Sequence, residues 1–175
     1  GMKLATGQFL AHGITSLQDT GWHNGLRHWQ EWRRLIECGA AVCRVSMLMG
    51  IDALDELREA SLSMGAGDSR LRIGGIKLAL DESTGCAAPP QEDVNRQALR
   101  AARAGFSVAL HVSDVPMLEG ALAAIQYVSK HLPEAGGRFR LEHCTICPPA
   151  LLLKARACRA IVVTQPSFLR YMGQP

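Results

Sequence analysis

The chain has 175 residues, of which 47% are hydrophobic and 20% are charged, and this composition is typical of a globular protein with a hydrophobic core. The net charge of +3, without a dense run of Lys and Arg, argues against a nucleic-acid-binding protein. No apolar stretch approaches the roughly 20 residues of a membrane-spanning helix, which argues against a membrane partner. No secretory leader is recognisable, so we expect a cytoplasmic protein.

Six short apolar or β-branched runs predict six strands. They begin roughly 20 to 35 residues apart, close to the length of about 30 residues that one β/α unit occupies. The runs are almost continuously apolar, as expected for parallel strands that are buried on both faces. The predicted strands cover residues 14–19, 42–48, 73–80, 108–112, 139–144 and 161–166.

Helical patterns fill the intervals between the predicted strands. In the first of them, Trp29, Trp32 and Ile36 recur on one face, and Gly39 is placed to end the helix. The longest opens on Ser113 or Asp114, both good N-terminal caps. The predicted helices cover residues 25–39, 52–64, 92–105, 113–133 and 148–159.

Strands that alternate with helices predict an α/β fold with a parallel sheet, in a single domain over residues 1–175. Both a (β/α)8 barrel and a doubly wound sheet fit this rhythm. In a barrel, the carboxyl ends of the strands meet at one mouth. Side chains that can bind or react stand at these ends: Asp19, Lys77, Asp81, His111, Glu142, His143 and Gln165. In a doubly wound sheet, ligands would instead bind where the strand order reverses.

The strand ends carry short motifs that resemble those of one family. In order they are G-I-T-S-L-Q-D from Gly13, G-G-I-K-L from Gly74, a strand-end histidine at His111, R-F-R-L-E-H from Arg138 and V-T-Q-P-S from Val163. Together they resemble the amidohydrolase superfamily, metal-dependent hydrolases on a (β/α)8 barrel. The most similar subgroup has a carboxylated lysine and includes the N-substituted formamide deformylases. The resemblance implies a partial barrel, from about its second strand to its seventh.

The resemblance also implies roles for these residues. His111 and His143 would bind a divalent metal, most simply zinc, through their imidazoles. Lys77 would be carboxylated and bridge two metals, and the metal would activate water for hydrolysis. The remaining strand-end residues would contact the metal ligands or the substrate: Asp19, Asp81, Glu142 and Gln165. No further catalytic residue is predicted.

Two elements of the family pattern are absent from the sequence: the His-x-His of the first barrel strand and the metal-binding Asp of the eighth. We therefore expect a hydrolase of amide or formamide C–N bonds in small molecules that is inactive as this isolated chain. Open barrel edges would expose apolar side chains, so we also expect a homo-oligomer that covers them. The alternative is an α/β domain that binds a small molecule or a protein partner without catalysis.

Cys144 and Cys147 form a C-x-x-C motif directly after His143. A zinc site needs four ligands, and a thioredoxin-like pair is not expected before two consecutive prolines, Pro148 and Pro149. We therefore interpret both as reduced thiols of a loop or of the core.

Overall fold

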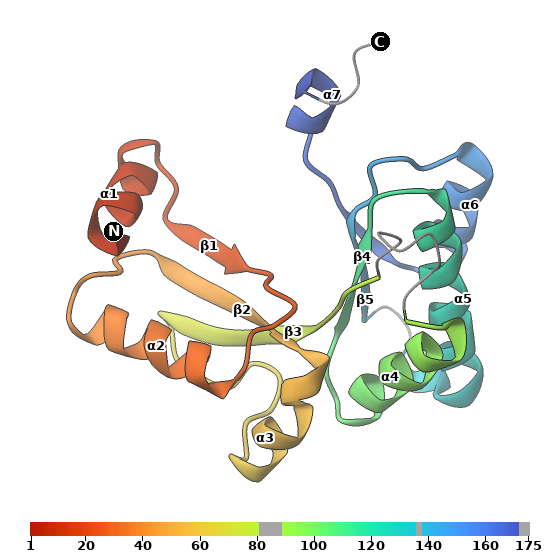
Figure 1. The fold of residues 1–175 in the computed structure, drawn as a ribbon, viewed down its shortest axis with the longest axis horizontal. Coiled ribbons are helices and arrows are strands. Elements are labelled where there is room, and N and C mark those ends of the chain that lie inside the picture. The colour runs from red at the N-terminus through yellow and green to blue at the C-terminus, as the bar shows by residue number, and fades with distance from the viewer. Residues whose placement is uncertain (81–88, 136–137, 172–175) are drawn as a thin grey trace. The chain divides into compact units, whose positions relative to one another are not determined.

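The computed structural model describes residues 1–80, 89–135 and 138–171. The chain forms two compact units, Gly1–Lys77 and Leu78–Pro175, and Figure 1 shows the elements of both. No helix in these described ranges is long and apolar enough to cross a membrane.

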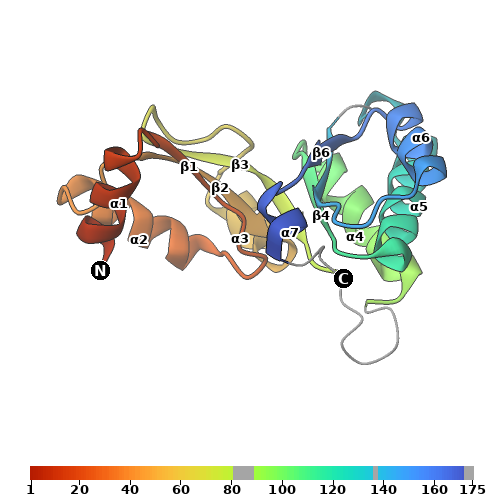
Figure 2. The same cartoon turned by 90° about the horizontal axis from the view of Figure 1, so that it is seen from above.

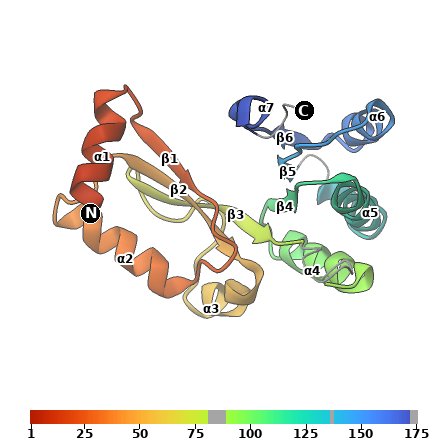
Figure 3. The same ribbon diagram turned by 45° about the horizontal axis from the view of Figure 1, so that its top comes forward.

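The first unit is a three-stranded parallel sheet with helices. The strands are β1 (Ser16–Asp19), β2 (Arg44–Gly50) and β3 (Leu71–Leu78), and the helical segments are α1 (Met2–Ala11), α2 (Leu26–Glu37), the short 3-10 turn η1 (Ile51–Ala53) and α3 (Leu54–Glu59). Helices α2 and α3 lie on one side of this sheet (Figures 1 and 3). Trp29 of α2 is buried, as are Val45 and Met47 of β2 and Ile73 of β3. Of the predicted apolar face of this helix, Trp29 belongs to the core, whereas Trp32 and Ile36 are partly exposed.

The second unit repeats the β/α pattern. Its strands are β4 (Val108–Val112), β5 (Phe139–His143) and β6 (Ile161–Val163), and its helical segments are α4 (Gln91–Arg103), α5 (Val115–His131), the 3-10 turn η2 (Pro133–Ala135), α6 (Pro149–Ala157) and α7 (Ser167–Tyr171). The three strands are parallel. Helices α4, α5 and α6 lie together on one side of the strands (Figures 2 and 3).

Helix α5 shows how the sequence builds this layer. It begins after Asp114, whose carboxylate accepts a hydrogen bond of 2.8 Å from the backbone N–H of Met117 and so caps the first turn. Its buried side chains Leu118, Leu122, Ile125 and Val128 recur every three or four residues and form one apolar stripe. The stripe contributes to the core that also contains the buried strand residues of β4 and β5.

The strand order follows the chain from β1 to β6 without a reversal among the described strands. A doubly wound sheet requires such a reversal, whereas a (β/α)8 barrel adds each parallel strand next to the preceding one. The fold class is therefore α/β, a partial (β/α)8 barrel, as the sequence predicts.

Several local predictions differ from the structure. The strand predicted over residues 161–166 ends at Val163, so Gln165 follows the strand. The helix predicted over residues 52–64 is shorter, because a 3-10 turn precedes α3 and the chain leaves the helix at Ser61, whose φ is 55°. Helices α1 and α7 were not predicted. The first two strands are not continuously apolar, since Ser16 and Gln18 of β1 and Arg44 of β2 are exposed.

Candidate metal centre

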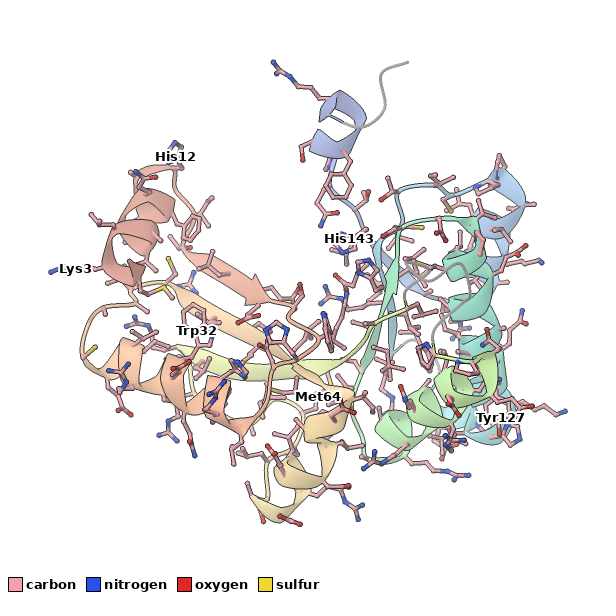
Figure 4. The ribbon with its side chains drawn as sticks, in the orientation of Figure 1. Lys3, His12, Trp32, Met64, Tyr127 and His143 are labelled. Atoms are coloured by element: carbon pink, nitrogen blue, oxygen red, sulfur yellow. The ribbon has the colours of Figure 1, made fainter. Side chains whose placement is uncertain are left out.

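Two histidines meet at the carboxyl ends of adjacent strands in the second unit. His111 lies on β4 and His143 is the last residue of β5. The centroids of their rings are 4.6 Å apart and the ring planes are inclined by 67°. Both side chains are partly exposed, and Figure 4 labels His143 at this end of the sheet. The pair is therefore accessible to a ligand.

A left-handed turn at the end of β5 brings the two rings together. Glu142 is in register with His111, and His143 is in register with Val112, so in a regular strand His143 would project to the opposite face from His111. His143 and Cys144 instead have φ values of 69° and 47°, and this conformation ends the regular alternation. The N–H of Cys144 donates to the carbonyl oxygens of Val112 and Glu142, both at 2.9 Å, which holds the turn.

Such a turn is unfavourable for residues other than glycine. The left-handed region costs roughly 1–2 kcal/mol per residue with a Cβ atom, and two such residues stand here in succession. Conformations of this kind persist where the surrounding structure enforces them, and they gather at functional sites.

Hydrogen bonds set the orientation of both rings. Nδ1 of His143 lies 2.9 Å from Oε1 of Gln165. Because an amide oxygen only accepts, Nδ1 carries a proton in this arrangement, and Nε2 is the ring nitrogen that a metal could use. Nε2 of His111 lies 2.9 Å from the hydroxyl oxygen of Ser113. When this Nε2–H donates to Ser113, the lone pair of His111 is on Nδ1.

This pair fits part of a metal site. Neutral imidazoles with oriented lone pairs are ordinary zinc ligands, but a catalytic zinc site uses three protein ligands and an open position for water. Within the described ranges, no third His, Cys, Asp or Glu lies with them in an arrangement that could hold a metal ion. The described part of the chain thus offers two imidazole donors, and the convergence of Lys77 with them stays a prediction.

Lys77 lies near the end of β3, in register with Gly50 of β2. Its exposed fraction is only 3%. Burial distinguishes it from an ordinary surface lysine, whose ammonium group reaches solvent. Whether it is carboxylated stays a prediction.

Asp19 holds the loop between β1 and α2. Its Oδ1 accepts from the amide of Asn24 at 2.8 Å and from the N–H of Gly21 at 3.1 Å, and its Oδ2 accepts from the indole of Trp32 at 2.9 Å. Burial alone would raise the pKa of Asp19, but these hydrogen bonds outweigh it and lower the pKa below its usual value. The geometry gives Asp19 a structural role, and a contact with a metal ligand or substrate stays a prediction.

Glu142 is buried on β5 beside the site. Its Oε1 accepts from Nε of Arg140 at 2.8 Å, in an ion pair whose side chains are 4% and 17% exposed respectively. Its register with His111 places this carboxylate next to the metal-ligand candidate along the sheet. Asp81 lies outside the described residues.

The C-x-x-C motif lies in the loop that joins β5 to α6. Cys144 is buried, and the cysteines that the structure describes are free. Burial, together with a hydrogen bond to Cys147, raises the pKa of the Cys144 thiol to about 12. This thiol is therefore protonated near neutral pH in the metal-free chain, whereas a redox nucleophile needs the thiolate.

Two residues beside the histidines were not predicted from the sequence. Ser113 was interpreted only as a helix cap, although its position two residues after His111 is a usable signal. Phe168 of α7 stacks on His143, with ring centroids 6.0 Å apart and planes inclined by 24°. Nothing in the local sequence indicates this contact, because α7 itself was not predicted.

Comparisons with known proteins support the fold class and show the family. A model of the amidohydrolase family matches residues 1–173. The fold is similar to uncharacterized metal-dependent hydrolases from Pyrococcus furiosus (TM-score 0.77, 22% identity over 97% of the chain) and Pyrococcus horikoshii OT3 (0.76, 21% over 95%). It is also similar to an L-hydantoinase (dihydropyrimidinase) from Arthrobacter aurescens (0.61, 14% over 97%). The chain spans 38%, 36% and 44% of these proteins, respectively. No curated protein matches it.

Proposed function

Since the chain belongs to the amidohydrolase family, we propose that it forms part of a metal-dependent hydrolase that cleaves C–N bonds of small amides or formamides. The observation that carries this proposal is the contact between His111 and His143 at the carboxyl ends of neighbouring strands. The C–N bond and the formamide class rest on the resemblance of the strand-end motifs.

Each of these residues would have its own role in metal binding. A divalent ion, most simply zinc, lowers the pKa of bound water to about 7 and so supplies a nucleophile when present. His111 and His143 would hold it with their lone pairs. Gln165 would fix the tautomer of His143 through Nδ1, and the hydroxyl of Ser113 would orient the ring of His111 through Nε2, as outer partners of metal-binding histidines do. Carboxylation of Lys77 would add an anionic oxygen ligand.

The isolated chain is proposed to be inactive. Its described residues provide two metal donors, fewer than the three of a catalytic zinc site. Proteins such as the Pyrococcus furiosus hydrolase, of which the chain spans 38%, have further segments that could supply the missing ligands. Lys77 would then remain uncarboxylated here, because the described donors are too few to hold the two metals that the carbamate would bridge.

Zinc titration of the purified chain tests the metal site. We expect His111→Ala and His143→Ala each to weaken zinc binding, measured by calorimetry, by at least about 10-fold, because losing a direct ligand should cost no less than losing an outer partner, which costs about 10- to 100-fold. The matched control is His131→Ala, which removes an exposed imidazole of α5. The thermal midpoints should stay close to that of the wild type.

Three results would contradict the proposal. Equal affinities for the control and the two site variants would show that zinc binds elsewhere. Absence of zinc binding would show that His111 and His143 do not hold a metal in this chain. Turnover of an N-formyl amine by the isolated chain would contradict its inactivity.

We also propose that the chain forms a homo-oligomer. In the second unit, α6 and the end strand β6 expose apolar side chains, and between them lies a pocket of about 500 Å³. Leu153 of α6 is 65% exposed and Ile161 of β6 is 54% exposed. Burial of such residues favours association. Size-exclusion chromatography with light scattering should give the mass of at least a dimer for the wild type. The Leu153→Glu variant should shift the equilibrium toward the monomer. A wild-type protein that elutes as a monomer would refute this proposal.

A further inference from the structure

The sheet face of the first unit that α2 and α3 leave uncovered is polar. Along β2, Val45 and Met47 are buried, whereas Arg44 is exposed and Ser46 is partly exposed. Strands of parallel sheets are usually apolar on both faces, because both faces are covered. A row of polar side chains on one face therefore indicates that this face meets polar groups.

The strand register gathers these side chains. Ser16 of β1 is opposite Arg44, and Ser46 is opposite Arg72 of β3. Residues in register on neighbouring strands project to the same face. From the strand spacing and the rise per residue, the Cα atoms of Arg44 and Arg72 lie roughly 8 Å apart. Two positively charged side chains thus start from neighbouring positions on one sheet face, with Cα atoms separated by about one Debye length at physiological salt.

Both arginines keep donors that the described protein does not use. Arg44 donates from Nε to the hydroxyl of Ser16 at 3.0 Å and from Nη2 to the hydroxyl of Thr15 at 2.9 Å. Arg72 donates from Nε to the carbonyl oxygen of Asp68 at 2.9 Å. A guanidinium group has five N–H donors, so most of them remain. Within the described ranges, neither arginine forms an ion pair.

These side chains line a pocket of about 430 Å³. Its polar lining consists of the two guanidinium groups and three serine hydroxyls, with no carboxylate: Ser16, Arg44, Ser46, Ser69 and Arg72. It lies on the amino-terminal halves of the strands, since Ser16 and Arg44 are the first residues of β1 and β2. The metal-ligand candidates stand instead at the carboxyl ends of their strands, so this pocket is a different site.

We propose that this pocket, named the Arg44–Arg72 pocket, binds a small oxyanion, a carboxylate or a phosphate. An oxyanion between the guanidinium groups would relieve their mutual repulsion and accept the remaining N–H donors in charge-assisted hydrogen bonds. The serine hydroxyls can donate to the same oxygens. The volume lies within the range of about 300–1,000 Å³ that small-molecule sites occupy, which leaves room for an organic anion.

The test is a titration of the ¹⁵N-labelled chain at low ionic strength, followed by NMR. Inorganic phosphate and succinate are the probes, and they distinguish phosphate from carboxylate as the preferred anion. We expect saturable shifts of the backbone amides around Ser16, Arg44 and Arg72. Arg44→Gln and Arg72→Gln should each lower the affinity for the preferred anion by about tenfold, which is equivalent to the loss of one charge-assisted hydrogen bond.

The matched control is Arg58→Gln, which removes one exposed positive charge from α3 in the same unit. It should leave the affinity within about twofold. Because Arg44 also donates to the hydroxyls of Thr15 and Ser16, its replacement could disturb β1. Arg72→Lys therefore provides a second, milder variant that keeps the charge and should recover part of the affinity. Equal weakening by Arg58→Gln, or shifts that do not saturate with either probe, would overturn the proposal.

Discussion

Replacement of Glu142 by alanine is expected to lower the free energy of unfolding by about 3 kcal/mol. The carboxylate is buried, and it accepts a hydrogen bond of 2.8 Å from Arg140. Removal of one partner of a buried ion pair costs roughly 3–5 kcal/mol, here through the loss of the charge-assisted hydrogen bond from Arg140. Because part of the Arg140 side chain reaches solvent, we expect a loss of stability at the low end of this range. Urea unfolding followed by circular dichroism measures it.

Asp93→Ala is the matched control for this experiment. Asp93 pairs with Arg96 at 2.6 Å, a shorter distance than that of Glu142 and Arg140, but the two side chains are 37% and 71% exposed. Exposed ion pairs contribute about 0–1 kcal/mol, so this variant should lose less than about 1 kcal/mol. Similar losses for Asp93→Ala and Glu142→Ala would show that burial does not decide the contribution of Glu142.

The repeating β/α units could be predicted from the sequence because their signal is local. Apolar runs such as residues 108–112 locate strands, and the spacing of about 30 residues indicates parallel crossover units. The positions of His111 and His143 at strand ends follow from the same pattern. The order of the strands then brings the two histidines onto neighbouring strands.

The details of the site depend on contacts that the sequence does not signal. The rings of His111 and His143 meet only because His143 and Cys144 adopt left-handed conformations, and neither is the glycine or asparagine that would indicate such a turn. Gln165 is 22 residues from His143. Such partners depend on tertiary packing, so their identity could be proposed only through the resemblance to a family.

The β1–α2 loop also depends on contacts between residues that are distant in the sequence. Its close approach to β2 predicts that a substitution at Gly50 is strongly destabilising. The N–H of Gly50 donates to the carbonyl oxygen of Asn24 at 2.8 Å, and the amide of Asn24 binds both Asp19 and the carbonyl oxygen of Leu48. A Cβ atom at Gly50 would lie 2.1 Å from the carbonyl oxygen of Trp22. The atoms nearest to this Cβ are the carbonyl oxygen and carbon of Trp22. They belong to the backbone, which cannot move aside as a flexible side chain can.

Gly50→Ala is therefore expected to lower the free energy of unfolding by about 4 kcal/mol, at the upper end of single-residue effects. The φ of Gly50 is −66°, which alanine adopts readily, so the loss would come from the steric contact alone. Gly7→Ala in α1 is the control, because its Cβ would meet nothing within 4 Å and alanine favours a helix by about 0.5–1 kcal/mol. Urea unfolding followed by tryptophan fluorescence reports on this unit, which contains Trp22, Trp29 and Trp32. A Gly50→Ala protein as stable as the wild type would mean that the loop does not approach β2 this closely, and the structural role of Asp19 would lose its main support.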